Sequence, residues 1–421
     1  MASRKPATKK AAKKPAKRSP STNKPATAQR SAAIANAVNE AMGFNAIGTV
    51  EDSGHTSLLR RPCGIAGLDV GTGGGLPADA VTLIVGPDGS GKTVLLDYYY
   101  AFHQTIYGDD ARILHIWVET KPDYLLMRKV GCRVGLPLAT IDDMEEGRRQ
   151  LGMEPLTLEE RTLLMEKTGT FHIATGGSGE EVLTILLKAL ETGFYHIIGI
   201  DSLSVLTSEA EYEKDMDDKE KMAARALLKR KFFDRYHKLQ RKLPELGGLK
   251  HETTILATGQ VRADMEASTY GRKFKNQDGW AVKHGNSVTV IVENGEKIKS
   301  GRSADKGAQI GKWFKWETQK GKEGVREGRK GKVQFMFNDN TMKSMIDVNA
   351  SLIEPLIQNG LLVEKRGGIN VLDANGSNLL EGINGVAELI RLLDEDPKLS
   401  VHVRQVLANK VTGLPCLFRR G

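Results

Sequence analysis

The chain has 421 residues, 40% of them hydrophobic, which is enough to bury the core of one large domain and a smaller one. No run of about 18 apolar residues is present, so no membrane-spanning helix is predicted, and the basic start of the chain lacks the apolar stretch of a secretory signal. The three cysteines and nine histidines are scattered without metal-site spacing, which favours a reducing, cytoplasmic setting.

The formal net charge of +9 is concentrated at the amino terminus. Residues 1–30 carry ten Lys and Arg and no acid, so the rest of the chain has a net charge near −1. Ala, Pro, Ser and Thr fill the remaining positions, and such a segment cannot bury enough apolar surface to fold. Residues 1–32 are therefore predicted to be a disordered tail that binds phosphate backbones without reading sequence. A solubilising or targeting tail is the alternative.

After the tail, residues 31–42 form an Ala-rich amphipathic stretch that predicts a helix. Farther along, apolar runs of strand length alternate with helical patterns, which is typical of an α/β domain with a mainly parallel sheet. The expected parallel strands are Val81–Val85, Ile113–Val118, Tyr195–Ile200, Thr253–Thr258 and Ser287–Val292. Two later runs, Lys312–Trp316 and Lys332–Phe337, alternate in polarity and are expected to be antiparallel.

Two stretches differ from this pattern. Residues 135–168 are acidic and helical, with a capping box at Thr157–Glu160, and are predicted to form a surface insertion. Residues 345–409 have a helix–strand–helix pattern of their own after a turn at Asn338–Thr341, which indicates a small separate domain.

A phosphate-binding loop is the clearest motif. It matches the pattern G-x-x-x-x-G-K-[ST] and consists of Gly86, Pro87, Asp88, Gly89, Ser90, Gly91, Lys92 and Thr93. The motif lies between a predicted strand and a predicted helix, so backbone N–H groups and the positive end of the helix point at phosphate oxygens. Lys92 can reach the β- and γ-phosphates, and the Thr93 hydroxyl can ligate Mg²⁺. The alternative is a Gly-rich turn that only joins strand to helix.

Two acids at the ends of other predicted strands complete a hydrolytic site. Asp201 ends the run from Tyr195, where it would anchor the metal through water, and Glu119 ends the run from Ile113. Glu119 is the candidate general base for attack of water on the γ-phosphate. Taken alone, Asp201 could be a turn residue and Glu119 a surface residue that caps the next helix.

These motifs resemble the core of the RecA recombinase family in their order and spacing. The likeness covers residues 33–410 and includes Gly75–Pro77, Asp201–Thr207, Met222–Arg225, Gln260, Leu361–Lys365 and Leu392–Lys398. It implies an α/β fold: a RecA-type P-loop ATPase core with a mainly parallel twisted sheet, a short amino-terminal polymerisation element and a small α/β carboxyl-terminal domain. The corresponding division is a tail at 1–32, an oligomerisation element of helix and strand at 33–60, the core at 61–343 and the last domain at 344–421.

The resemblance also implies roles for particular residues. Gln260 would sense the γ-phosphate, and Asp123 would read the adenine amino group. Lys320 and Lys322 resemble paired lysines that reach a neighbouring subunit's ATP, although a solvated basic hairpin is the alternative in this Lys-rich region. Residues 31–46 resemble the element that docks on the next subunit, which would give an open helical filament.

Two DNA-binding loops are implied, at about 209–221 and 262–283. The longer loop interleaves cations with aromatic rings, which suits single-stranded nucleic acid, although an ordinary exposed loop is the alternative. The candidate residues are Arg225, Arg262, Tyr270, Arg272, Lys273, Phe274, Gly279, Trp280 and Lys283.

The chain departs from the family pattern in several places. Leu126 stands where an aromatic ring usually stacks on adenine, and Tyr124 could supply a ring only from a different position. The insertion has no counterpart in the common bacterial form, and the shorter loop is acidic. These departures are consistent with a divergent member, for example a phage-encoded one.

The function implied by the resemblance is that of a DNA-dependent ATPase. It would form a homo-oligomeric filament on single-stranded DNA, with ATP and Mg²⁺, and exchange strands with homologous duplex DNA in recombination and repair. This would place it in the cytoplasm, associated with the nucleoid. A ring-forming motor of the helicase type is the alternative, although a sizeable amino-terminal helical domain is lacking. A third hypothesis is a DNA-coating protein that uses ATP only as a switch. The presence of Glu119 and the paired lysines, which indicate hydrolysis, disfavours it.

Overall fold

The computed structural model describes residues 60–119, 122–212, 218–242, 253–263, 274–276, 279–300, 307–322, 324–337 and 346–412, together with the helical residues Ala33, Asn36, Ala37 and Glu40. The expected basic tail and most of the expected amino-terminal element lie outside the described residues. None of the helices that the structure describes is long and apolar enough to cross a lipid bilayer.

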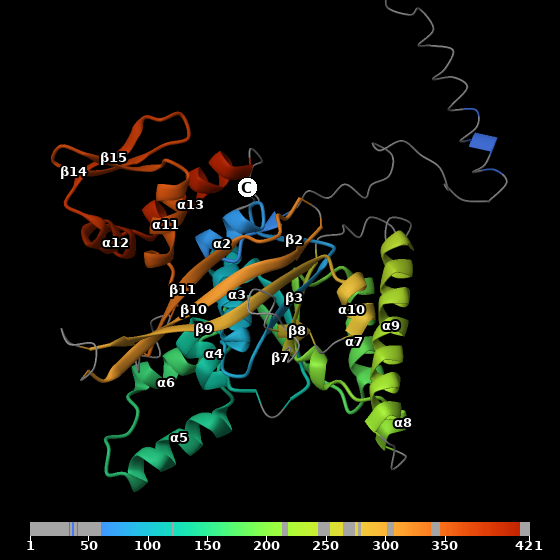
Figure 1. Cartoon of the computed structure of the whole chain (residues 1–421). Helices are drawn as coiled ribbons and strands as arrows, with labels where there is room; N and C mark the ends of the chain where they lie inside the picture. Colours follow the sequence, from blue (N-terminus) through green and yellow to red (C-terminus); the bar gives the residue numbers. More distant parts are fainter. Residues whose placement is uncertain are drawn as a thin grey trace, which may run out of the picture. The chain divides into compact units, whose positions relative to one another are not determined.

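A ten-stranded mixed sheet forms the centre of the fold (Figure 1). Its parallel part has the strand order β9-β3-β7-β6-β4-β5, and β10, β11 and β12 continue it in antiparallel fashion beyond β9. The parallel strands are β3 (Val81–Gly86), β4 (Arg112–Trp117), β5 (Thr170–Thr175), β6 (Ile197–Asp201), β7 (Thr254–Ala263) and β9 (Val288–Lys299). The antiparallel strands are β10 (Gln309–Gly321), β11 (Lys330–Met336), β12 (Ile346–Asp347) and the short β8 (Phe274–Asn276), which pairs with β7 outside this order. All seven expected strands are confirmed within a few residues, except that β7, β9 and β10 are several residues longer.

Helices cover both faces of this sheet. One face carries α3 (Lys92–Tyr107) and α4 (Tyr124–Val130), and the other carries α7 (Gly179–Thr192), α9 (Asp218–Lys242) and α10 (Gly279–Gly285). Each face has its own buried apolar cluster, to which the strands contribute alternate residues. Because both faces are covered, the central strands are continuous apolar runs, which is why their positions were predictable.

A smaller unit follows the sheet. It contains α11 (Ile353–Gln358), a three-stranded antiparallel sheet of β13 (Leu362–Lys365), β14 (Gly368–Leu372) and β15 (Asn378–Ile383), then α12 (Val386–Glu395) and α13 (Pro397–Thr412). Its separate apolar cluster also takes in Ala66 and Val70 of α2 (Ala66–Gly71). The short strands β1 (Arg60–Arg61) and β2 (Leu76–Pro77) precede and follow α2 in the sequence and pair with each other in antiparallel fashion.

Between α4 and β5 the chain forms a two-helix protrusion, with α5 (Leu138–Gln150) and α6 (Leu158–Met165). Both hydrogen bonds of the expected capping box between Thr157 and Glu160 are present, so that prediction is confirmed. A bridge between Val134 and Lys167 closes the base of the protrusion.

The expected long loop at 262–283 differs from its prediction. Strand β7 continues to Ala263 and pairs with β8 (Phe274–Asn276), and α10 begins at Gly279. The segment therefore begins with a strand pair and ends with a helix. Val261, a residue type that favours strands, lies in the part of β7 that extends beyond the central sheet to pair with β8. Before it, α8 (Glu209–Tyr212) is a single helical turn.

Candidate nucleotide-binding site

The phosphate-binding loop joins the carboxyl end of β3, the strand between β9 and β7, to α3. Two of its glycines cannot be replaced without collision. A Cβ at Gly91, where φ is +89°, would lie 2.4 Å from the Phe314 ring, and one at Gly86 would lie 2.2 Å from the Val292 carbonyl oxygen. The fully buried Ser90 hydroxyl has no hydrogen-bond partner among the described residues. The sequence therefore folds this loop as a tight cradle of backbone groups.

Lys92 lies folded onto that cradle. Its Nζ donates to the carbonyl oxygens of Gly86, at 3.0 Å, and Pro87, at 2.9 Å. Burial lowers the pKa of Lys92, while the nearby carboxylates of Asp88, Asp201 and Glu119 act in the opposite direction. The ammonium therefore occupies a site that is partly desolvated and faces three acids, and a phosphate oxygen could replace the two carbonyls.

Asp201 ends β6 and is buried between two hydroxyl donors. The Thr93 hydroxyl donates to its Oδ2 at 2.7 Å, and the Thr258 hydroxyl donates to its Oδ1. The expected pair of metal anchors is thus brought into direct contact. The described residues contain no cluster of three or more His, Cys, Asp or Glu side chains that could hold a metal alone. This donor set fits Mg²⁺, which usually keeps several waters and takes few protein oxygens beside those of a phosphate.

Glu119 and Gln260 lie at the same edge of the sheet. Trp117 of β4 pairs with Asp201 of β6, so Glu119 follows two residues beyond the paired position. The Ser202 hydroxyl donates to the Glu119 carboxylate at 2.8 Å. Gln260 of β7 pairs in register with Gly86 of β3, and its backbone N–H donates to the Ser204 hydroxyl at 2.7 Å. The ends of four adjacent parallel strands thus converge on the phosphate loop, as expected for ligand sites in such sheets.

Four residues of this site were not expected from the sequence. Ser202, Ser204 and Thr258 position the groups just described, and Lys312 of β10 donates to the Gly89 carbonyl oxygen at 2.8 Å. The only sequence signal was the presence of hydroxyl residues beside acids at strand ends. Which acid each hydroxyl serves depends on strand order.

Asp123 caps α4, since its Oδ1 accepts from the Leu126 backbone N–H at 2.9 Å. The Tyr124 side chain packs against the apolar cluster of the protrusion and against the core cluster that Leu126 also contacts. The expected role of Asp123 toward adenine stays a prediction.

The expected DNA-binding residues are only partly described. Arg225 of α9 forms an ion pair with Glu211 of α8 at 3.0 Å, and Lys283 is an exposed residue of α10. The structure gives the backbone alone for Arg262, Phe274, Gly279 and Trp280, while Tyr270, Arg272 and Lys273 lie outside the described residues.

The paired lysines contact the end of α10. Lys320 Nζ donates to Asn286 Oδ1 at 3.1 Å and to the carbonyl oxygens of Lys283 and Asn286, and Lys322 Nζ donates to the His284 carbonyl oxygen at 3.3 Å. Partial burial, followed by the charges of Lys322 and Lys283, lowers the pKa of Lys320 to about 8.

The sheet order and the phosphate loop define this protein as one with a RecA-type P-loop core. No protein-family model matches the chain. The chain is similar to curated proteins named Protein RecA. That of Solidesulfovibrio magneticus is 26% identical over 282 residues, or 64% of each chain. That of Nitratiruptor sp. is 26% identical over 73% of this chain and 74% of its own, and that of Nostoc sp. is 23% identical over 90% and 88%. The match with the first of these spans somewhat less than two thirds of that relative's length. These similarities support a divergent member of the RecA family.

Proposed function

We propose that this protein is an ATP- and Mg²⁺-dependent DNA recombinase. It forms a helical filament on single-stranded DNA and exchanges strands with a homologous duplex. One observation carries the proposal: Lys92, the Thr93–Asp201 pair, Glu119 and Gln260 converge at one edge of the sheet, in a chain similar to proteins named RecA.

The site's own residues supply the chemistry of hydrolysis. Lys92 would exchange its two carbonyl partners for phosphate oxygens, and Thr93 and Asp201 would hold the metal, Thr93 through its hydroxyl and Asp201 through water. Bound Mg²⁺ supplies stabilisation of the phosphate charge. Glu119, oriented by Ser202, accepts the proton of the attacking water.

Strand β7 connects this site to the proposed DNA-binding segment. Gln260 lies beside Gly86 of the phosphate loop, and the next three residues of the same strand pair with β8. The residues between β7 and β8 in the sequence include cations and rings expected to hold phosphates and stack on bases. The presence of a γ-phosphate is thus transmitted along one continuous backbone.

Assembly of copies would complete the site. Lys320 and Lys322 would leave the end of α10 and reach the nucleotide of a neighbouring copy, as an arginine finger does. Two adjoining cavities of about 250 and 310 Å³ line the groove between α7 and α9. Their mostly apolar lining, which includes Leu183, Leu187 and Leu227, suits the docking element expected at residues 31–46 of a second copy, with its amphipathic stretch at 31–42.

Electron microscopy with single-stranded DNA, Mg²⁺ and a slowly hydrolysed ATP analogue tests the proposal. Extended helical filaments that require the nucleotide are expected, and Lys92→Ala should abolish both the filaments and ATP turnover. Normal turnover by that variant would contradict the site assignment. Closed rings of the wild-type protein would instead support a ring-forming motor.

A further inference from the structure

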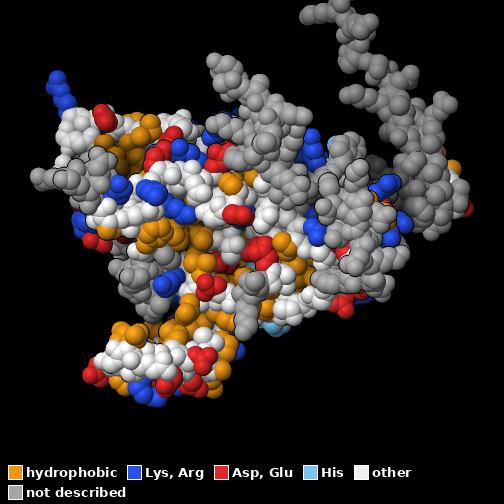
Figure 2. Space-filling model, turned by 60° about the horizontal axis from the view of Figure 1, so that its bottom comes forward, with side chains coloured by type: hydrophobic (Ala, Val, Ile, Leu, Met, Phe, Trp, Pro, Cys, Tyr) orange, Lys and Arg blue, Asp and Glu red, His pale blue; other side chains and the backbone are white. Residues whose placement is uncertain are grey.

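The turn between α5 and α6, with the first residue of α6, exposes three large apolar side chains within eight residues. The exposed fractions are 78% for Leu151, 51% for Met153 and 81% for Leu158. Single exposed apolar residues are ordinary, but a local group of them on a protruding turn marks a contact surface. Figure 2 shows hydrophobic surface together with acidic and basic side chains on this part of the molecule.

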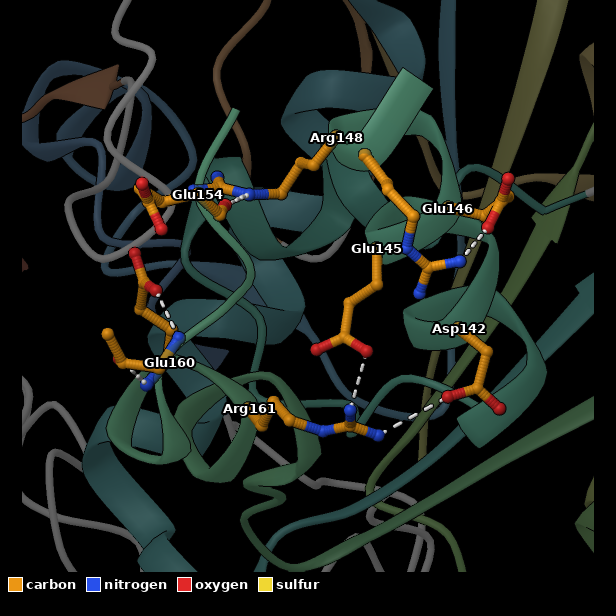
Figure 3. Close-up of polar contacts among 9 residues, drawn as sticks. Asp142, Glu145, Glu146, Arg148, Glu154, Glu160 and Arg161 are labelled. Atoms are coloured by element: carbon orange, nitrogen blue, oxygen red, sulfur yellow. Dashed lines mark hydrogen bonds and ion pairs between the residues drawn. The ribbon is translucent and has the colours of Figure 1, made fainter. Parts of the chain in front are cut away.

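Polar contacts join α5 to α6 and α5 to the turn (Figure 3). Arg161 of α6 forms ion pairs with Glu145, at 2.7 Å, and Asp142, at 3.3 Å, both on α5. Arg148 Nε donates to the Glu154 carbonyl oxygen at 2.7 Å, within the turn itself. The apolar side chains are therefore presented by an ordered scaffold.

The base of the protrusion is fixed to the helix that begins beside the nucleotide site. Arg128 of α4 is fully buried and donates to the carbonyl oxygens of Glu166, at 3.0 Å, and Leu163. Tyr124 and Leu125 of the same helix pack against the small apolar cluster of the protrusion. Asp123 is the N-cap of α4 and the residue expected to read adenine, so the protrusion would stand on the adenine side of the proposed site.

The acidic protrusion has a basic counterpart elsewhere in the chain. Residues 135–168 contain eight Asp and Glu and four Lys and Arg, whereas residues 309–336, which form β10, β11 and their connecting turn, contain eight Lys and Arg and three Glu. The second segment carries Lys320 and Lys322. In the proposed filament these lysines approach a neighbour's nucleotide, so the basic segment of one copy and the acidic protrusion of the next flank the same interface.

We propose that residues 135–168 form a second contact between copies of this chain. The occupant is the β10–β11 turn of a neighbouring copy, in which Arg326 and Arg329 are exposed. Their aliphatic stems cover the apolar tip while their guanidinium groups meet its acidic flank. The inference rests on the proposed function, because it is the shared nucleotide that places these two segments together.

A charge exchange tests the contact. Asp143 and Glu154 are exposed, and neither side chain forms an ion pair with any other described residue, so their replacement leaves the protrusion's own network intact. Asp143→Lys/Glu154→Lys and Arg326→Glu/Arg329→Glu should each raise the protein concentration needed for assembly about tenfold, measured by light scattering and sedimentation velocity. A chain with all four changes should return to within about twofold of wild type. Additive defects in that chain, or wild-type assembly of the first variant, would overturn the proposal.

A second pair of variants tests the apolar tip. Leu151→Ser/Leu158→Ser should weaken assembly, whereas Ile357→Ser, at a residue of α11 that is 54% exposed, should not. Equal behaviour of the two would also overturn the proposal.

Each series is run with the ATP analogue, with and without single-stranded DNA. If wild type self-associates only in the absence of DNA, the recombinase proposal fails while the charge exchange still decides the contact. If wild type stays monomeric throughout, both proposals fail.

Discussion

Thr258→Val is the sharpest test of how the metal anchor is held. Thr258 is fully buried, Asp201 is 5% exposed, and the hydroxyl of the first donates to the carboxylate of the second. Valine keeps the shape and removes the donor, and water cannot easily replace it at so buried a position. A hydrogen bond to a charged group contributes about 1.5–3 kcal/mol, so the free energy of unfolding should fall by about 2 kcal/mol. For a core of this size, with an unfolding entropy of about 2.1 cal/mol/K per residue, that corresponds to a decrease of roughly 3–4 °C in Tm.

Thr82→Val in the adjacent strand β3 is the matched control. Thr82 is also fully buried, but its hydroxyl has no hydrogen-bond partner among the described residues. Replacing it should leave the Tm unchanged or raise it slightly, because an unsatisfied polar group is removed.

The functional consequence is read separately, by titrating Mg²⁺ against binding of a fluorescent ATP analogue. With Thr93 as its one remaining hydroxyl donor, Asp201 is less well oriented, and the Mg²⁺ concentration for half-maximal binding should rise about tenfold in Thr258→Val, or 1.4 kcal/mol. If the two valine variants show the same Tm and the same Mg²⁺ dependence, the hydroxyl of Thr258 does not hold the anchor.

Three further outcomes are expected. Glu119→Gln should keep nucleotide binding and lower the turnover number about 100-fold or more, as single-turnover assays would show; unchanged turnover would exclude it as general base. Gly91→Ala should abolish nucleotide binding because its Cβ would collide with Phe314. Gly89 has a similar positive φ, but no atom lies within 4 Å of the Cβ position, so Gly89→Ala should bind nucleotide within about tenfold of wild type. An equal loss of binding in both variants would assign the effect to backbone strain. Since the pKa of Lys320 is lowered to about 8 while it contacts the end of α10, the unassembled protein loses this ammonium as pH rises through that value, so the protein concentration needed for half-maximal turnover should rise between pH 7 and 9, and Lys320→Arg should lessen that rise. In the unfolded chain this lysine keeps its proton to about pH 10.4, so between pH 8 and that value the unfolded state binds more protons and stability rises with pH, which separates the loss of activity from unfolding.

The phosphate loop and the central strands were predictable because their information is local. Gly86–Thr93 specifies its own backbone through glycine positions, and the buried strands are continuous apolar runs. The edge strand β5 was missed because Thr170–Thr175 is only half buried and mixes polar with apolar residues, so neither strand pattern is clear.

The contacts that orient the site were not predictable from one sequence. Ser202 and Glu119 are 83 positions apart, and Lys312 reaches Gly89 across 223 positions. Each contact exists because particular strands are neighbours with a particular register, and that order is decided by packing of the whole sheet. The sequence near a strand end shows that a hydroxyl is available. It does not show which carboxylate will accept a hydrogen bond from that hydroxyl.

The proposed DNA-binding segment is joined to nucleotide-linked residues on both of its sides. Before it, β7 carries Thr258, which holds the metal anchor of the same copy, and Gln260, which lies beside the phosphate loop. After it, the carboxyl end of α10 holds Lys320 and Lys322, which are proposed to serve the nucleotide of a neighbour. A displacement of this segment on binding DNA would therefore act on two nucleotides, its own through β7 and the neighbour's through α10. Hydrolysis would then depend on DNA and on assembly together, and a monomer with DNA, or a filament without it, would each lack one of the two inputs.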